Sequence, residues 1–252
     1  MRKLLVPLLA LIGIVAGGCI IQFSTLYVDD VSRTHFVGLA SNLTNADVVS
    51  ASVEVRFYDS SNNLLATKSV SPCTRTLQAH QSSPVESIIP AGVTVKRAET
   101  VVHPQTFGEK MVSDFDIKNI SFEKDGTVAH LKGEVTNNDN EAFYAVQVCA
   151  AFYDDDDDVV RVGSDYLDLT TLSEDKTGEF DIEIEDWTAD AEQYELWVDA
   201  ATRSPKDVTA PVVEGPDDIP GLATATPTAT GTPPTSTPTP TSTPTVAPTS
   251  ST

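Results

Sequence analysis

An internal repeat constrains this chain more than any other feature of its sequence. Residues 35–77 align without a gap with residues 130–172, at a constant offset of 95 positions. Eleven residues of the first copy meet an identical residue in the second: His35, Gly38, Asn42, Asn45, Val53, Phe57, Tyr58, Asp59, Ser69, Thr76 and Leu77. Self-similarity in one ungapped frame is typical of a repeated structural unit. The sequence therefore predicts a duplicated domain.

Each copy alternates apolar and polar residues as β-strands do. In VEVRFY, residues 53–58, every second residue is apolar, and the segment at 148–153 occupies the same place in the second copy. A period of two predicts strands with one buried face, and the Asn- and Asp-rich segments that precede them favour turns. We expect an all-β chain with two tandem antiparallel, immunoglobulin-like β-sandwich domains, over residues 25–110 and 115–202.

Three short motifs occur in both copies. The first copy carries them as Gly38, Asn42 and Phe57-Tyr58-Asp59, and the second as Gly133, Asn137 and Phe152-Tyr153-Asp154. On these residues, roughly 25–105 and 115–200 resemble the FxLYD family of small β-sandwich modules. The resemblance implies an exported prokaryotic protein, since such modules often occur in tandem and in lipoproteins. It implies no catalytic residues.

The N-terminus has the pattern of an export signal. A basic start, an apolar stretch from Leu4 and the small residues Ala16-Gly17-Gly18 precede Cys19. This order predicts a signal peptide over residues 1–18. The cysteine directly after the small residues resembles a lipobox, although Ala16 stands where a large aliphatic residue is usual. The resemblance implies that Cys19 is lipidated and that residues 19–24 form a linker.

A second interpretation of the N-terminus is an uncleaved membrane anchor. The stretch from Leu4 to Ile21 is about long enough to span a thinned bilayer. Both interpretations place the protein at the cell membrane, with the remainder outside the cytoplasm, at the cell surface or in the periplasm.

The C-terminal residues 203–252 are predicted to form a disordered tail. From Ala223 the chain is rich in Thr and Pro and has no charged residue. Regular prolines disfavour helix and sheet, and there is too little apolar surface to offset the entropy of ordering. An O-glycosylated stalk and an unmodified spacer both fit this composition.

Five consecutive aspartates are the candidate cation-binding residues: Asp154, Asp155, Asp156, Asp157 and Asp158. The run aligns with DSSNN at 59–63, between two predicted strands, which favours a solvated hairpin turn. It lacks the spaced ligands of an EF-hand, so Ca²⁺ is retained only as a candidate ligand. No other cofactor is predicted, and the sequence does not indicate which metal, if any, is bound.

The two copies differ sharply in charge. Residues 20–114 hold nine acids and seven bases, whereas residues 115–200 hold 24 acids and five bases. A chain of net charge −21 is expected to repel nucleic acid. Adaptation to high salt, repulsion from anionic lipid headgroups and recognition of a cationic partner or Ca²⁺ each explain the acidic second copy.

Cys73 and Cys149 occupy non-equivalent positions in the repeat. Cys73 aligns with Asp168, and Cys149 aligns with Glu54 on the outward face of its predicted strand. A bridge within one domain is therefore excluded. A disulfide between the domains and two free thiols remain as alternatives, and an environment outside the cytoplasm permits the disulfide.

No catalytic motif is present in the sequence. There is no G-x-S-x-G, H-E-x-x-H or C-x-x-C, and the repeat-equivalent His35 and His130 fit an architectural role. Trp187 and Trp197 are predicted to be buried packing residues rather than a carbohydrate-stacking platform.

We therefore expect a non-enzymatic, membrane-anchored envelope lipoprotein. Its role would be structural or interactive, through contacts with an envelope protein or polymer that the sequence does not identify. The alternative is a cation-responsive module centred on the acidic second copy.

Overall fold

The computed structural model describes residues 18–107, 113–187, 191–201 and 212–220, and over these ranges the protein is built from strands and turns. We call residues 18–107 module 1 and the described residues from 113 onward module 2. Module 1 contains β1 (Cys19–Val28), β2 (Thr34–Asn42), β3 (Val48–Tyr58), β4 (Leu64–Val70), β5 (Ser82–Ile89) and β6 (Arg97–Phe107). Module 2 contains β7 (Phe115–Asp125), β8 (Val128–Asn137), β9 (Phe143–Tyr153), β10 (Val159–Tyr166), β11 (Thr171–Leu172), β12 (Thr177–Ile184), β13 (Gln193–Ala201) and β14 (Val212–Asp218).

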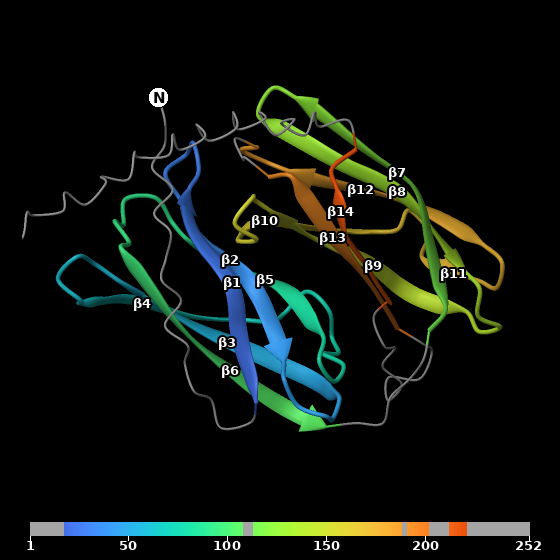
Figure 1. The fold of residues 1–252 in the computed structure, drawn as a ribbon, viewed down its shortest axis with the longest axis horizontal. Coiled ribbons are helices and arrows are strands. Elements are labelled where there is room, and N and C mark those ends of the chain that lie inside the picture. The colour runs from blue at the N-terminus through green and yellow to red at the C-terminus, as the bar shows by residue number, and fades with distance from the viewer. Residues whose placement is uncertain (1–17, 108–112, 188–190, 202–211, 221–252) are drawn as a thin grey trace, which may run out of the picture. The chain divides into compact units, whose positions relative to one another are not determined.

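Each module is a sandwich of two antiparallel sheets (Figure 1). In module 1 the sheets have the strand orders β1-β2-β5 and β4-β3-β6. In module 2 the orders are β7-β8-β12 and β10-β9-β13-β14, and the short β11 also pairs with β9. The predicted all-β fold with two tandem β-sandwiches is therefore confirmed.

The duplication inferred from the sequence is present in the strands themselves. Both ends of β9 lie 95 residues after those of β3, and both ends of β12 lie 95 residues after those of β5. The first strands differ slightly, because Cys19 pairs with Asn42 whereas Phe115 pairs with Asn137. The β7–β8 hairpin is thus one residue shorter than the β1–β2 hairpin, and the two modules otherwise share one register.

Apolar side chains from both sheets form a separate core in each module. In module 1 the alternation of β3 buries Val53, Val55 and Phe57 completely. Their counterparts in module 2 are Val148, Ala150 and Phe152, which are equally buried. Removal of this apolar surface from water is the main stabilising contribution, about 25 cal/mol for each Å².

The shared asparagines connect the strands of each module. Asn42 Nδ2 donates to the carbonyl oxygens of Ala46 (2.8 Å) and Leu77 (3.0 Å), and its Oδ1 accepts from Thr44 N (3.0 Å). Asn137 makes the same three bonds, to the carbonyl oxygens of Glu141 (2.7 Å) and Leu172 (3.1 Å) and from Asp139 N (2.9 Å). A buried amide with two donors and an acceptor thus closes each Asn-rich turn.

Two predicted boundaries are wrong. Residues 19–24, expected to be a linker, lie in β1, because Cys19 and Ile21 pack against the module 1 core. Residues 212–218, expected to belong to the tail, form β14, because they pair with the edge of β13. Module 1 and module 2 belong to one compact unit that extends to Leu222. Residues 1–17 of the signal predicted over residues 1–18, and the Thr/Pro-rich segment from Ala223, lie outside the described residues.

The described ranges contain no helix of the length and apolar character needed to cross a membrane.

Candidate functional site

The aspartate run forms the turn between β9 and β10. Asp154 Oδ1 accepts from the backbone amides of Asp156 (3.1 Å) and Asp158 (2.9 Å), and Asp157 has a φ of 62°. The equivalent turn of module 1 is built in the same way. There Asp59 Oδ1 accepts from Ser61 N (2.7 Å) and Asn63 N (2.9 Å), and Asn62 also has a φ of 62°. The run therefore has the turn geometry of DSSNN, and its first aspartate makes the bonds that hold the turn.

The five aspartates do not converge on a common point. Within the described ranges, the one group of three acidic, His or Cys side chains with ligand atoms within 4.8 Å of one another is Asp29, Asp30 and Asp186. Burial and the negative charges of the neighbouring aspartates raise the pKa of Asp158. The aspartate run thus has the charge but not the geometry of a cation site.

Two of these three carboxylates, those of Asp29 and Asp186, already have protein partners. Asp30 N donates to Asp186 Oδ2 (2.6 Å), which joins the two modules. Asp29 accepts from Arg33 and from His35 Nε2 (3.1 Å). Burial acts to raise the pKa of Asp29, but the hydrogen bonds from Arg33 and His35 outweigh it and lower the pKa overall.

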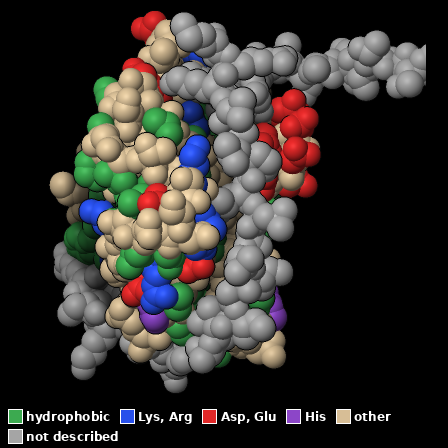
Figure 2. Space-filling view, turned by 90° about the vertical axis from the view of Figure 1, so that its left-hand side faces the viewer, with side chains coloured by type: hydrophobic (Ala, Val, Ile, Leu, Met, Phe, Trp, Pro, Cys, Tyr) green, Lys and Arg blue, Asp and Glu red, His purple; other side chains and the backbone are tan. Residues whose placement is uncertain are grey.

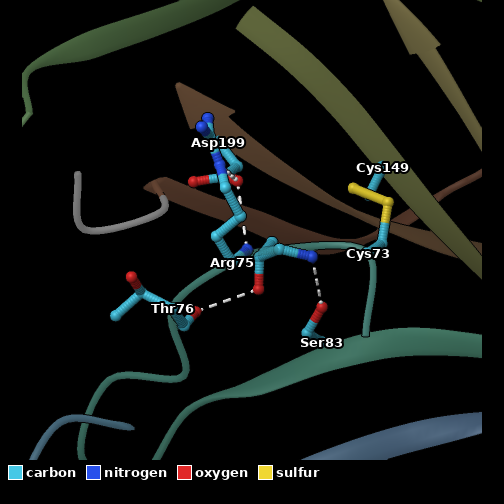
Figure 3. Close-up of a disulfide and its surroundings, with 7 residues drawn as sticks. Cys73, Arg75, Thr76, Ser83, Cys149 and Asp199 are labelled. Atoms are coloured by element: carbon cyan, nitrogen blue, oxygen red, sulfur yellow. Dashed lines mark hydrogen bonds and ion pairs between the residues drawn. A yellow bond between two sulfur atoms is a disulfide. The ribbon is translucent and has the colours of Figure 1, made fainter. Parts of the chain in front are cut away.

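The junction between the modules brings together the predicted cysteines. A disulfide joins Cys73, in the loop between β4 and β5, to Cys149 on β9, with the Cα atoms 6.2 Å apart (Figure 3). Close beside it, Arg75 donates from its backbone N (3.1 Å) and from Nε (2.9 Å) to Asp199 Oδ2. Asp199 has a side chain only 1% exposed. One loop of module 1 thus contacts β9 and β13 of module 2 through a covalent bond and an ion pair.

An apolar cluster extends the junction away from the disulfide. It combines Val37 and Leu39 of β2 with residues on the outer face of the larger module 2 sheet: Cys149, Ala151, Tyr153, Val159 and Trp197. Cys149 points out of its own sandwich, as predicted, and it is nevertheless fully buried because module 1 covers it. Both tryptophans are buried as expected, Trp187 inside module 2 and Trp197 in this cluster.

A buried arginine completes the junction on the side of β10. The guanidinium carbon of Arg161 lies 3.7 Å from the ring centroid of Tyr27. Its Nη2 donates to the carbonyl oxygen of Asp186 (3.0 Å). Burial lowers the pKa of Arg161 and raises that of Tyr27. A desolvated cation over an aromatic face contributes about 2 kcal/mol, so this contact couples β1 to β10.

A cleft of about 440 Å³ opens between the modules. Its walls come from β1, β2 and the segment before β5 in module 1, and from β9, β13 and β14 in module 2. Within it the Tyr153 hydroxyl donates to Glu195 Oε2 at 2.6 Å. Burial raises the pKa of Glu195 more than the hydrogen bond from Tyr153 lowers it.

Cys19, the predicted lipidation site, lies inside module 1. Its side chain is fully buried, and its Sγ is 3.8 Å from Asn42 Oδ1. Burial raises the pKa of the Cys19 thiol. A lipid on this sulfur would therefore require the first residues of β1 to leave the sheet.

One face of the molecule carries a mixture of side chains. Figure 2 shows the side on which β4 lies in Figure 1, and there hydrophobic, basic and acidic side chains are interspersed. Acidic side chains gather at one edge of that view.

Sequence reasoning missed the residues that join the modules, above all Tyr27, Arg161 and Asp199. One sequence feature could have indicated the junction. In β9 both faces of the strand are apolar from Val148 to Tyr153. A strand that is apolar at both phases is covered on both faces, whereas VEVRFY of module 1 alternates with charged residues.

No protein-family model matches the chain, and no curated protein matches it. Solved structures that match include an exo-chitosanase, CsxA, from Amycolatopsis orientalis, at 8% identity and a TM-score of 0.29, over 76% of this chain and 26% of that one. Red sea bream transglutaminase matches at 9% identity and a TM-score of 0.24, over 76% of this chain and 31% of that one. A putative β-galactosidase from Bacteroides fragilis matches at 12% identity and a TM-score of 0.24, over 77% and 33%. The chain thus spans about a quarter to a third of the length of these structures.

Proposed function

We propose that this chain is a non-enzymatic envelope protein, held at the membrane by its N-terminus, whose two FxLYD-like modules act as one rigid body in a structural or protein-interaction role. The observation that carries the proposal is the junction between the modules. It combines the Cys73–Cys149 disulfide, the Arg75–Asp199 ion pair and a continuous apolar cluster. Such a junction favours a fixed spacer or display unit over two independent domains on a flexible linker.

The disulfide also supports a location outside the cytoplasm. Structural disulfides persist in oxidising compartments and are rare where thiols are kept reduced. The bridge closes 76 residues of chain and lies between two modules. This agrees with an N-terminus that has a basic start, an apolar stretch and small residues.

Two modes of tethering remain within the proposal. A lipid on Cys19 follows from the resemblance to a lipobox, and an uncleaved apolar segment from Leu4 follows from its length. The buried position of Cys19 in β1 favours the uncleaved segment, because a lipidated sulfur must reach the bilayer. With either tether, the two modules lie outside the cytoplasm.

Fractionation of the cells that produce the protein tests the location. We expect the chain in the membrane fraction, accessible to a protease added outside the cytoplasm. Intact mass spectrometry separates the tethers, since cleavage with a diacylglyceryl group on Cys19 and retention of residues 1–18 give different masses. Recovery of the chain in the cytosol would contradict the proposal.

A cation-responsive role for module 2 is the second candidate, favoured by the 24 acids among residues 115–200. The measurement is the melting temperature in millimolar Ca²⁺ against the same ionic strength of NaCl. A rise in Ca²⁺ alone supports this role, and equal melting temperatures eliminate it.

A further inference from the structure

Two segments of the chain have the Asn-x-Ser/Thr pattern of an N-glycosylation acceptor. They are Asn42-Leu43-Thr44 and Asn119-Ile120-Ser121, and no other segment of the sequence has this pattern. In an exported protein such a motif marks a site of glycan attachment where it lies on the surface. The structure distinguishes the two asparagines by their surroundings.

Asn42 cannot carry a glycan in the folded protein. Its side chain is completely buried, and Nδ2 donates to the carbonyl oxygens of Ala46 (2.8 Å), Leu77 (3.0 Å) and Gln78 (3.1 Å). An amide nitrogen has two hydrogens, and these contacts use both. A sugar on this nitrogen would replace one hydrogen and would have to lie where no surface is exposed. Asn42 is therefore a structural residue.

Asn119 has the opposite surroundings. It lies in the bulge of β7 with a φ of 56°, and both Asn119 and Ser121 are exposed. A bulge changes the direction of a side chain, and asparagine tolerates this left-handed backbone. Among the described residues, Asn119 Nδ2 donates one hydrogen bond, to Glu134 Oε2 (2.8 Å) on the surface. The second N–H is thus available for a bond to a sugar.

A hollow of about 500 Å³ lies beside Asn119, with walls from β7, β8, β10 and β12 of module 2. One lining residue is Tyr166, which is 58% exposed. The acidic lining residues are Glu134, Asp165, Asp168, Glu179 and Asp181. Carboxylates accept hydrogen bonds from hydroxyl groups, and an aromatic ring offers an apolar face to the C–H groups of a sugar. The hollow therefore suits the first sugars of a glycan on Asn119.

We propose that Asn119 carries an N-linked glycan whose first sugars lie in this hollow. The donor is a saccharide carried on a lipid diphosphate. Asn119 Nδ2 forms a bond to C1 of the first sugar, and the bond from C1 to the phosphate oxygen breaks. The lipid diphosphate leaves with that electron pair, and one N–H proton passes to solvent. The inference rests on the proposed location outside the cytoplasm, because export brings the chain to such a donor.

Mass spectrometry of the chain purified from the cells that naturally produce it tests the site. Peptides that contain Asn119 should carry a mass increase of whole sugar residues, and electron-transfer fragmentation should localise it to Asn119. Peptides that contain Asn42 should carry no sugar, since that side chain is buried. The same chain from an expression host without N-glycosylation gives the unmodified reference.

Variants at Ser121 test whether the motif directs the attachment. Ser121→Ala removes the hydroxyl of the motif without changing Asn119, and it should abolish the mass increase. Ser121→Thr is the matched control, because it keeps a hydroxyl, and it should retain the glycan. Since Ser121 is exposed, neither change should shift the melting temperature of the unglycosylated chain appreciably.

The effect of the glycan on melting tests its place in the hollow. We expect the glycosylated chain to melt at a higher temperature than the unglycosylated chain. Tyr166→Ala should reduce this increase at least twofold while the glycan stays attached. Because Tyr166 is largely exposed, its removal should leave the melting temperature of the unglycosylated chain nearly unchanged. An increase of equal size in the variant refutes the hollow as the place of the first sugars.

Two results overturn the attachment site. One is an unmodified Asn119 in chain that is accessible to a protease outside the cytoplasm, and the other is a mass increase that persists in Ser121→Ala. Recovery of unmodified chain in the cytosol is a different failure. It refutes the proposed location and, with it, the glycan that depends on that location.

Discussion

At the scale of single residues, the asparagines shared by the two copies explain why the repeat tolerates so much other divergence. Asn42 and Asn137 are completely buried, and each links the end of one strand to the following turn and to a segment 35 residues further along the chain. An aspartate of the same size would lack the donors, and a leucine would lack every polar partner. The asparagine that the two copies share is thus a fold-determining contact in each module.

Replacement of Asn137 by alanine is expected to destabilise the protein by about 2 kcal/mol or more, because it leaves the buried carbonyl oxygen of Leu172 without its side-chain donor. Urea unfolding measures the loss. Asn138→Ala is the matched control, since Asn138 is exposed, and it should change the free energy of unfolding by less than about 0.5 kcal/mol. Equal losses in the two variants would show that the buried amide is not important.

At the scale of elements, the strand positions were predictable because both copies carry the same pattern. The alternation in VEVRFY and the constant offset place β3 and β9 correctly, and the aspartate run aligns with a turn. The boundaries at Cys19 and Val212 were not predictable. The residues before Cys19 have a pattern that predicts an export signal and not a strand. The pairing of β14 with β13 is a contact that no local pattern specifies.

The aspartate turn yields a pH prediction. The pKa of Asp158 is raised in the folded protein by burial and by neighbouring aspartates, so folding disfavours its charged form. A carboxyl group of this kind stabilises most below the pKa that it has in the unfolded chain, and the contribution is lost as the pH rises through its folded pKa.

Asp158→Asn, which installs the residue that module 1 has at Asn63, should therefore raise the stability at pH 7, by about 0.5 kcal/mol. The gain should shrink as the pH falls below the folded pKa and vanish well below pH 4, and thermal melts across this range measure it. The control Asp218→Asn alters an exposed carboxylate on β14. If Asp158→Asn raises the stability as much in acid as at pH 7, the gain does not come from the charge of Asp158.

At the scale of the whole molecule, the sequence predicted only part of the junction between the modules. The repeat placed Cys149 on an outward face, which excluded a bridge within one module. It could not show that Val37 and Leu39 cover that face, because these two residues come from the other module. The pattern that the two copies share reflects contacts within each module, so it does not predict contacts between the modules. The contact of Arg161 with the ring of Tyr27 is one of these.

The disulfide and the noncovalent contacts of the junction should each contribute to the stability of the two-module unit. The Cys73→Ser, Cys149→Ser double variant removes a cross-link that closes 76 residues, and the usual loss is about 2–4 kcal/mol in the free energy of unfolding. The apolar cluster and the Arg75–Asp199 pair remain, so we expect one cooperative urea transition at a lower midpoint.

Reductant should shift the wild-type midpoint by the same amount and leave the variant unchanged. Thiol labelling of the denatured, unreduced wild-type chain should spare Cys73 and Cys149. Two separate transitions in the variant would mean that the disulfide alone holds the modules together, and labelled cysteines in the wild-type chain would mean that no bridge forms.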